Sequence, residues 1–301
     1  MWVELSLLAG CLQTLRNAVA RSLARTVPAS LNSWARFAFN LPFAALLALG
    51  AAVRLGAPAL PRAFFGYCLA GALLQLLANV ALVSAFRRAN FAESIALHKL
   101  EVVFSAGVGF ALFGEHPSPA GWLGVLTCGA GVLLVNLGRE GAPGWRRAFR
   151  LDAGGLFALT CAVLLAFTSF LLKEAMREFA AANPALGGPG FPGAVHTLFH
   201  ATWMEVAILT AHLLAFRRGE LALVPRHWRR MAAMGASAFG ASLCWFWAFS
   251  LALVAYVRAV GQIESVLAVA LALALWRERE VWRQLPGLLL LGSGIGLVLL
   301  G

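Results

Sequence analysis

The chain of 301 residues is 61% hydrophobic and only 12% charged, and its mean hydropathy is +0.80. These values exclude a water-soluble domain and indicate an integral membrane protein. The apolar runs are also too long for the strands of a membrane barrel, which alternate over about 10 residues, so they predict spanning helices of about 20 residues.

The net charge of +11 comes mainly from arginines in the short connections between apolar runs. Because these cations form no single basic face, we interpret them as topology anchors and lipid-headgroup contacts. The lipid bilayer is therefore an expected partner and nucleic acid is not. The five cysteines all fall inside apolar runs without a CxxC pair, which predicts packing residues and neither disulfides nor metal ligands.

Arginine, proline and glycine residues interrupt the apolar runs and divide this all-α chain into about ten predicted helices. A hydrophilic linker, residues 139–151, separates the first five helices (residues 1–138) from the last five (residues 152–301). Since each half has an odd number of spans, the second half must enter the membrane in the opposite sense, which gives two inverted five-helix repeats. The predicted helices lie near residues 2–23, 31–53, 62–86, 91–113, 119–138, 152–176, 194–216, 230–250, 253–276 and 284–300.

A direct sequence duplication supports the two repeats. The stretch Leu97–Val135 returns as Val260–Val298 at a constant offset and without a gap. Ionisable groups inside a bilayer cost several kcal/mol and are usually functional, so a duplicated glutamate in a hydrocarbon-length helix suggests a site built on internal symmetry. The matched residues are Glu101 with Glu264, Glu115 with Glu278, Gly124 with Gly287, Gly129 with Gly292, and Gly131 with Gly294.

The arginines concentrate in the connections that follow odd-numbered helices. The positive-inside rule then places these connections in the cytoplasm and both termini outside. We expect a multi-pass protein of the inner (plasma) membrane, present as a monomer or a homodimer.

A long helix that ends in Gly-Glu, a short turn with prolines (Phe113–Pro119) and a glycine-rich helix follow one another in the first repeat. This pattern, with Arg36–Phe39 in the second span and Arg277–Arg279 in the second copy, resembles the drug/metabolite transporter superfamily, specifically its EamA-type members. The resemblance covers nearly the whole chain. It implies a ten-helix transporter of small metabolites that works by alternating access.

The chain departs from that family at two points. Family members usually carry a proline where this chain has Val102 and Ser265, so we expect the fourth and ninth helices to be straighter and more acidic than usual. Family members also usually have both termini in the cytoplasm, opposite to the orientation that the arginines predict.

Two predicted spans combine charges of both signs. In the fourth span, Ser94, His98, Glu101 and Ser105 follow three- and four-residue spacing and share one helix face, whereas Lys99 points elsewhere. The ninth span offers Tyr256, Arg258, Gln262 and Glu264. Each repeat therefore brings a cation and a carboxylate to a similar depth.

Two interpretations of these charges remain open. They could hold the ammonium and carboxylate ends of a zwitterion, and a protonatable glutamate would let proton entry drive exchange. Alternatively, the cations neutralise the glutamates as structural bridges. Polar residues of other spans could line a cavity or join helices. The candidate substrate-binding or coupling residues are Glu101, Glu264, His98, Lys99, Arg258, Gln262, Tyr256, Arg16, Asn17, Arg36, Gln75, Asn79 and Trp245.

The sequence favours a secondary active transporter that exports a small polar or zwitterionic metabolite such as an amino acid. It shows no phosphate-binding loop and no nucleophile motif, so we expect neither an enzyme nor a bound cofactor or metal. Two alternatives stay open: a passive facilitator, and a membrane-embedded metal-dependent enzyme or lipid-handling protein that uses His196, His200 and Glu205. Glu115 and Glu278, at helix ends, are expected to cap helices or pair with arginine.

Overall fold

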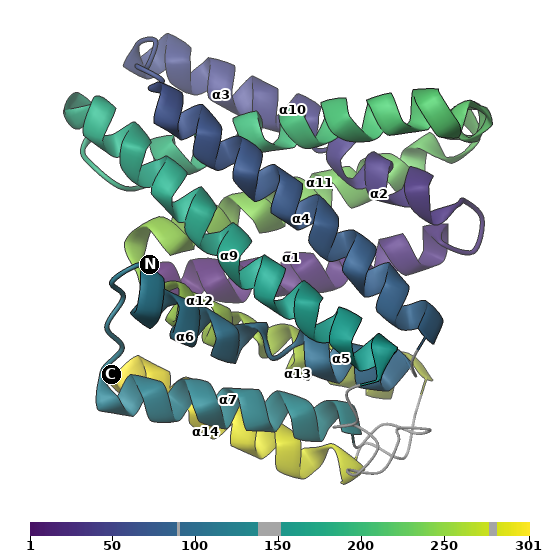
Figure 1. Ribbon diagram of the computed structural model, residues 1–301. Coiled ribbons are helices and arrows are strands. Elements are labelled where there is room, and N and C mark those ends of the chain that lie inside the picture. The colour runs from purple at the N-terminus through teal and green to yellow at the C-terminus, as the bar shows by residue number, and fades with distance from the viewer. Residues whose placement is uncertain (89–90, 138–151, 277–281) are drawn as a thin grey trace. The chain divides into compact units, whose positions relative to one another are not determined.

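The computed structural model describes residues 1–88, 91–137, 152–276 and 282–301, and every regular element in these ranges is a helix (Figure 1). The residues therefore form the all-α fold that the apolar runs predict. The helices are α1 (Trp2–Leu23), α2 (Ala29–Ala38), α3 (Leu41–Leu55), α4 (Arg62–Arg88), α5 (Phe91–His98), α6 (Glu101–Leu112), α7 (Pro119–Leu137), α9 (Ala153–Ala182), η1 (Pro184–Leu186), α10 (Phe191–Phe216), η2 (Arg218–Leu223), α11 (Val224–Leu251), α12 (Val254–Gly261), α13 (Ile263–Trp276) and α14 (Leu285–Leu300).

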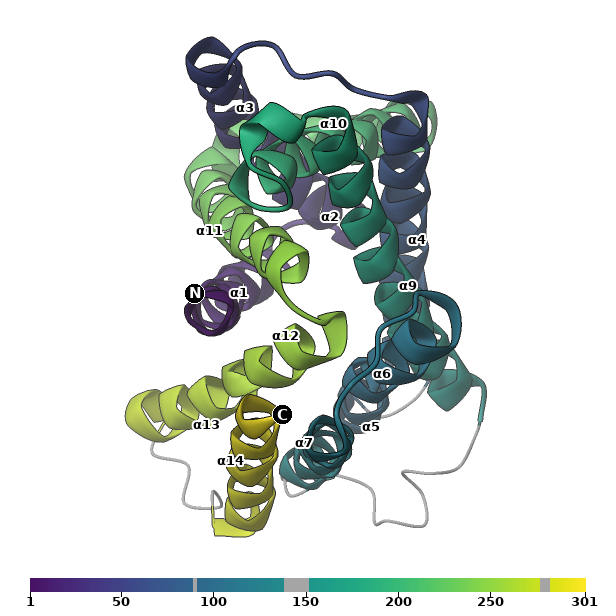
Figure 2. The same cartoon turned by 90° about the vertical axis from the view of Figure 1, so that its left-hand side faces the viewer.

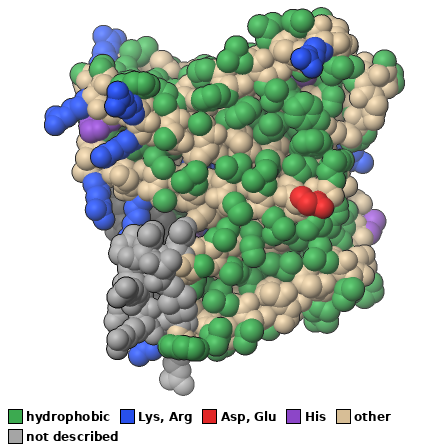
Figure 3. Space-filling model, turned by 180° about the vertical axis from the view of Figure 1, so that it is seen from behind, with side chains coloured by type: hydrophobic (Ala, Val, Ile, Leu, Met, Phe, Trp, Pro, Cys, Tyr) green, Lys and Arg blue, Asp and Glu red, His purple; other side chains and the backbone are tan. Residues whose placement is uncertain are grey.

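Six helical segments of the described chain are long and apolar enough to cross a membrane, which makes this a multi-pass membrane protein. The prediction of ten spans is not confirmed. Its fourth and ninth spans are each divided into two short helices, so neither piece alone has the length to cross. Large apolar side chains such as Leu46, Leu49 and Val53 face outward, and hydrophobic side chains are spread over the face shown in Figure 3, as expected of a lipid-facing surface.

The divisions of the fourth and ninth spans share one geometry. Leu100 separates α5 from α6 with φ −64° and ψ −3°, and Gln262 separates α12 from α13 with φ −63° and ψ −5°. At both places the chain makes three-residue turns: Leu100 N–H donates to Leu97 O (3.2 Å) and Gln262 N–H to Ala259 O (3.1 Å). Figure 2 shows α12 running on into α13. Both helices are therefore interrupted although they lack the proline, and their greater straightness than in other family members stays a prediction.

The chain folds into two compact units, and each unit combines segments from both predicted repeats. The first unit comprises Met1–Leu73 and Leu171–Leu251, and the second comprises Leu74–Phe170 and Ala252–Gly301. The repeat boundaries at residues 138 and 152 remain a prediction, because the linker 139–151 lies outside the described residues.

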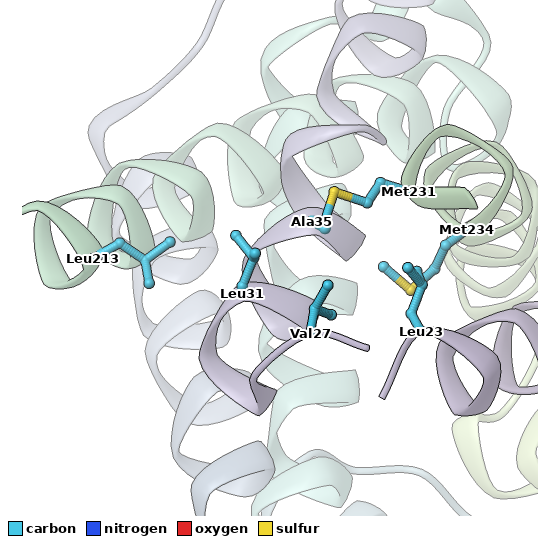
Figure 4. Close-up of a cluster of buried hydrophobic side chains, with 7 residues drawn as sticks. All are labelled: Leu23, Val27, Leu31, Ala35, Leu213, Met231 and Met234. Atoms are coloured by element: carbon cyan, nitrogen blue, oxygen red, sulfur yellow. The ribbon is translucent and has the colours of Figure 1, made fainter. Parts of the chain in front are cut away.

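In the first unit, α1 packs along α11, and α10 packs against α2, α3 and α11. Packing alternates between small and large residues: Gly240 of α11 lies against Leu12 of α1, and Gly235 lies against Phe39 at the end of α2. Figure 4 shows the apolar cluster where these helices meet. Its buried members are Leu23, Val27, Leu31, Ala35, Leu213, Met231 and Met234.

In the second unit, α7 and α14 lie side by side along their lengths (Figure 1). The duplicated glycines make this contact reciprocally. A Cβ atom on Gly131 would lie 3.0 Å from the carbonyl oxygen of Gly287, and one on Gly287 would lie 2.9 Å from that of Gly131. Gly124 and Gly294 are related in the same way, at 2.9 Å each. Glycine is required at these positions because the two backbones touch.

Substitution of alanine at the glycine contact tests this packing. We expect Gly131→Ala and Gly287→Ala each to destabilise the protein by about 1–3 kcal/mol, the usual cost of overpacking, and to lower its thermal unfolding midpoint in detergent. The control is Gly292→Ala on α14, where a Cβ would meet nothing within 4 Å. It should be neutral or slightly stabilising, and an equal loss in all three variants would contradict the backbone contact.

Candidate functional site

Four charged side chains of the second unit, two buried glutamates and two partly buried cations, form two crossed ion pairs. Lys99, between α5 and α6, pairs with Glu264 Oε1 of α13, and Arg258 Nη1 of α12 lies 3.3 Å from Glu101 Oε1 of α6. Each glutamate is thus neutralised by a cation from the other divided span. The glutamates are only 4% and 7% exposed, so each charge depends on its partner rather than on water.

The divisions of the spans explain why these charges sit where they do. Glu101 and Glu264 lie in the first turns of α6 and α13, whereas His98 and Arg258 lie in the last turns of α5 and α12. A helix N-terminus favours an anion and a helix C-terminus favours a cation. Each division therefore creates, inside an apolar chain segment, one end that suits a carboxylate and one end that suits a base.

Several polar atoms near the ion pairs have no hydrogen-bond partner among the described residues. They are Oε2 of Glu101, Oγ of Ser94 and Ser105, and Oε1 of Gln262, all buried. Buried polar atoms without partners are uncommon in native proteins and point to water or a polar ligand. The group can therefore offer both charges and neutral hydrogen-bonding atoms to a small polar molecule.

Neighbouring side chains hold the site residues in position. Arg258 Nη2 donates a 2.7 Å hydrogen bond to Oγ of Ser169 on α9, and His98 Nδ1 lies 3.5 Å from Sγ of Cys161 on the same helix. Sequence reasoning did not select Ser169 or Cys161. Their only signal is a polar or small residue in an apolar helix, and nothing in the spacing along the chain connects that helix to the charged spans.

Tyr256 and Glu115 each accept a hydrogen bond from a backbone N–H at the start of a helix in the second unit. The Tyr256 hydroxyl accepts a 3.0 Å hydrogen bond from the Ser118 N–H at the start of α7. The Glu115 carboxylate accepts the N–H of Val254 at 2.9 Å and so caps α12. Tyr256 therefore joins α12 to α7. Glu278, the predicted counterpart of Glu115, lies outside the described residues.

Most of the other candidate residues belong to the first unit and make contacts there. Arg16 Nη2 donates to the Asn17 side-chain oxygen at 2.9 Å on α1, and Trp245 Nε1 donates to Gln13 Oε1 at 3.1 Å. These residues and Arg36 belong to the first unit. Gln75 and Asn79 lie half-buried on α4, in the second unit.

The histidines of α10 contact aromatic rings. The His196 ring stacks on Phe179 with centroids 5.1 Å apart, and His200 Nδ1 accepts a 3.0 Å hydrogen bond from Trp203 Nε1. Within the described ranges, no group of three metal-ligating side chains comes together. The metal-dependent alternative therefore gains no support.

The crossed pairing can be tested through stability. Lys99→Met leaves the Glu264 carboxylate buried without its cation, and we expect a loss of about 3–5 kcal/mol. Adding Glu264→Gln should recover much of this loss, whereas adding Glu101→Gln should recover less. Arg177→Met, which removes an exposed pair with Glu174 on α9, is the control and should cost at most about 1 kcal/mol. Thermal unfolding in detergent measures all four variants, and equal recovery by both glutamine substitutions would contradict the pairing.

The first part of the chain matches a known protein family, and the whole chain matches a known fold. Residues 5–137 match the EamA-like transporter family. A solved crystal structure of a protein aligns with 99% of this chain and 96% of its own length, with a TM-score of 0.71 and 19% sequence identity, which establishes a shared fold. None of the curated proteins matches. This match confirms, over residues 5–137, the resemblance to the EamA-type members of the drug/metabolite transporter superfamily.

Proposed function

We propose that this protein is a secondary active transporter that exports a small polar or zwitterionic metabolite, such as an amino acid, across the inner (plasma) membrane by alternating access. The observation that carries the proposal is the pair of crossed ion pairs, Lys99 with Glu264 and Arg258 with Glu101, at two matched divisions of apolar spans. Discontinuous helices with charged termini are the usual sites of substrates and coupling ions in secondary transporters.

The ion pairs suit a cycle of binding and release. A zwitterion or a proton that enters this group replaces part of an existing pair rather than meeting an isolated charge, so its binding need not leave a charge unpaired in hydrocarbon. The unpartnered oxygens of Ser94, Ser105 and Gln262 supply hydrogen-bonding positions for the same occupant. Binding and release would then exchange one set of hydrogen-bonding and ionic partners for another with a small net change in free energy.

Proton coupling and inverted repeats complete the proposal. A proton on Glu101 or Glu264 would release its cation, and this change links protonation to the position of α6 or α13. The duplication of the glutamates and glycines supports two structurally equivalent repeats in opposite orientations, which can exchange their conformations to open the site on either side.

Glutamine substitutions at the two glutamates test this function. We expect a panel of amino acids, nucleosides, polyamines and quaternary amines to contain a zwitterion that raises the unfolding midpoint of the purified protein. Counterflow and pH-gradient-driven uptake of that zwitterion are then measured in reconstituted vesicles. Glu101→Gln and Glu264→Gln should each reduce gradient-driven flux by about tenfold or more, because the charge that exchanges partners is gone.

The matched control is Glu174→Gln, which removes a glutamate paired with the exposed Arg177 and should transport normally. Undiminished and pH-independent flux in both site variants, with folding intact, would reject proton coupling. Equilibration without accumulation in the wild type would instead indicate a passive facilitator.

A further inference from the structure

Seven exposed arginines of the first unit lie in two segments, one at the end of α1 and one between the end of α10 and the first turns of α11. The only acidic residue of these two segments is Glu220, and its carboxylate accepts a hydrogen bond from Ser30. Within the described ranges, none of the seven arginines forms an ion pair with a carboxylate. The positive charge of the two segments is therefore largely uncompensated. The members of this arginine cluster are Arg21, Arg25, Arg217, Arg218, Arg226, Arg229 and Arg230.

A buried apolar cluster brings the two segments together at one end of the first unit. Leu23, which follows Arg21 by two positions, and Met231, which directly follows Arg230, belong to the same buried cluster. Leu213, near the end of α10, is also a member. Figure 4 shows the side chains of this cluster. The arginines that flank its members therefore gather at one end of the unit, although the two segments are far apart in the sequence.

Exposed apolar side chains lie directly beside these arginines. Phe216 at the end of α10 is 74% exposed and precedes Arg217, and Trp228 in the first turns of α11 is 52% exposed. The guanidinium of Arg229 lies over the Trp228 ring, 5.7 Å from its centroid. Tryptophan with one apolar and one polar end is typical of the membrane–water interface. This end of the unit thus presents cations and apolar surface next to each other.

The position of the cluster along the chain places it at a membrane surface. Its second segment joins Phe191–Phe216 to Arg218–Leu251, and both are long and apolar enough to cross a membrane. A membrane surface made only of zwitterionic lipid has no net charge to balance the arginines, whereas an anionic lipid supplies it. The exposed apolar side chains favour a lipid over a soluble anion, because acyl chains can cover them and a soluble anion cannot.

We propose that the arginine cluster is a binding site for phospholipid with a net negative charge, such as phosphatidylglycerol. The guanidinium groups bind the phosphate oxygens with paired hydrogen bonds, and Phe216 and Trp228 contact the acyl chains. Because the cluster contains residues of α1, η2 and α11, a bound lipid links elements that are far apart in the sequence. It therefore stabilises the folded first unit. The site lies outside the ion pairs of the second unit, so the inference goes beyond the proposed function.

Thermal unfolding of the purified full-length protein in mixed micelles tests the preference for negative charge. Phosphatidylglycerol should raise the unfolding midpoint by about 3 °C or more above its value in phosphatidylcholine with the same acyl chains. Arg226→Gln/Arg229→Gln should lose about half of this difference or more, and should unfold near the wild-type temperature in phosphatidylcholine. Equal wild-type midpoints in the two lipids would overturn the site.

The matched control removes the same charge elsewhere in the first unit. Arg54 and Arg62 are exposed at the ends of α3 and α4, and Arg54→Gln/Arg62→Gln should keep the full difference between the lipids. An equal loss in the two double variants would show a response to net charge alone and would overturn a localised site. Inorganic phosphate and a polyglutamate peptide are the soluble probes. If either raises the midpoint as much as phosphatidylglycerol does, the cluster binds soluble anions and the lipid assignment is overturned.

Phosphatidylglycerol with brominated acyl chains tests the apolar part of the site, because bromine quenches tryptophan fluorescence at short range. The difference in quenching between wild type and Trp228→Phe reports the contact of Trp228 with the lipid. This difference should be larger with brominated phosphatidylglycerol than with brominated phosphatidylcholine at the same mole fraction, and Arg226→Gln/Arg229→Gln should abolish the excess. Equal quenching by the two lipids would overturn the site. Neither test uses a transported substrate, so failure here would leave the proposed transport function unaffected.

Discussion

Hydrocarbon solvates neither a charge nor an open backbone group, and this constraint decides where the polar residues of the second unit lie. Dividing an apolar span exposes one helix C-terminus and one helix N-terminus in the middle of the segment. The termini can be satisfied only by groups that the protein supplies, and a base before the division and an acid after it do so. His98 before Glu101, and Arg258 before Glu264, follow this order. The charges and the divisions are therefore parts of one arrangement.

The glycine contact between α7 and α14 supports the helices that carry these charges. Gly124, Gly131, Gly287 and Gly294 let the two backbones touch, and α12 packs against both helices. Tyr256 extends this contact, because its ring lies directly over Gly121 at the start of α7. Arg258 follows Tyr256 by two positions on the same short helix. The position of the Arg258 guanidinium thus depends on uncharged residues, because the close packing of the α7 and α14 backbones positions the short helix that carries it.

The sequence predicts the class of the fold and the repeated elements well, because both depend on local pattern. Hydrophobic runs identify the helices, and the duplication identifies Glu101 with Glu264 and the reciprocal glycines before any coordinates are known. The divisions at Leu100 and Gln262 are harder to predict in this way, since neither contains a proline and only the second has a glycine, Gly261, beside it. Which cation meets which glutamate also depends on tertiary contact. Lys99 is two positions from Glu101 in sequence yet pairs with Glu264.

The crossed ion pairs link the binding of a charge to a change of conformation. Each carboxylate already touches a cation, as Glu101 touches Arg258, so an incoming charge must displace a partner. Binding there is therefore linked to rearrangement of the helices that carry the pair. A transporter needs this link, because a site that only binds would hold its substrate.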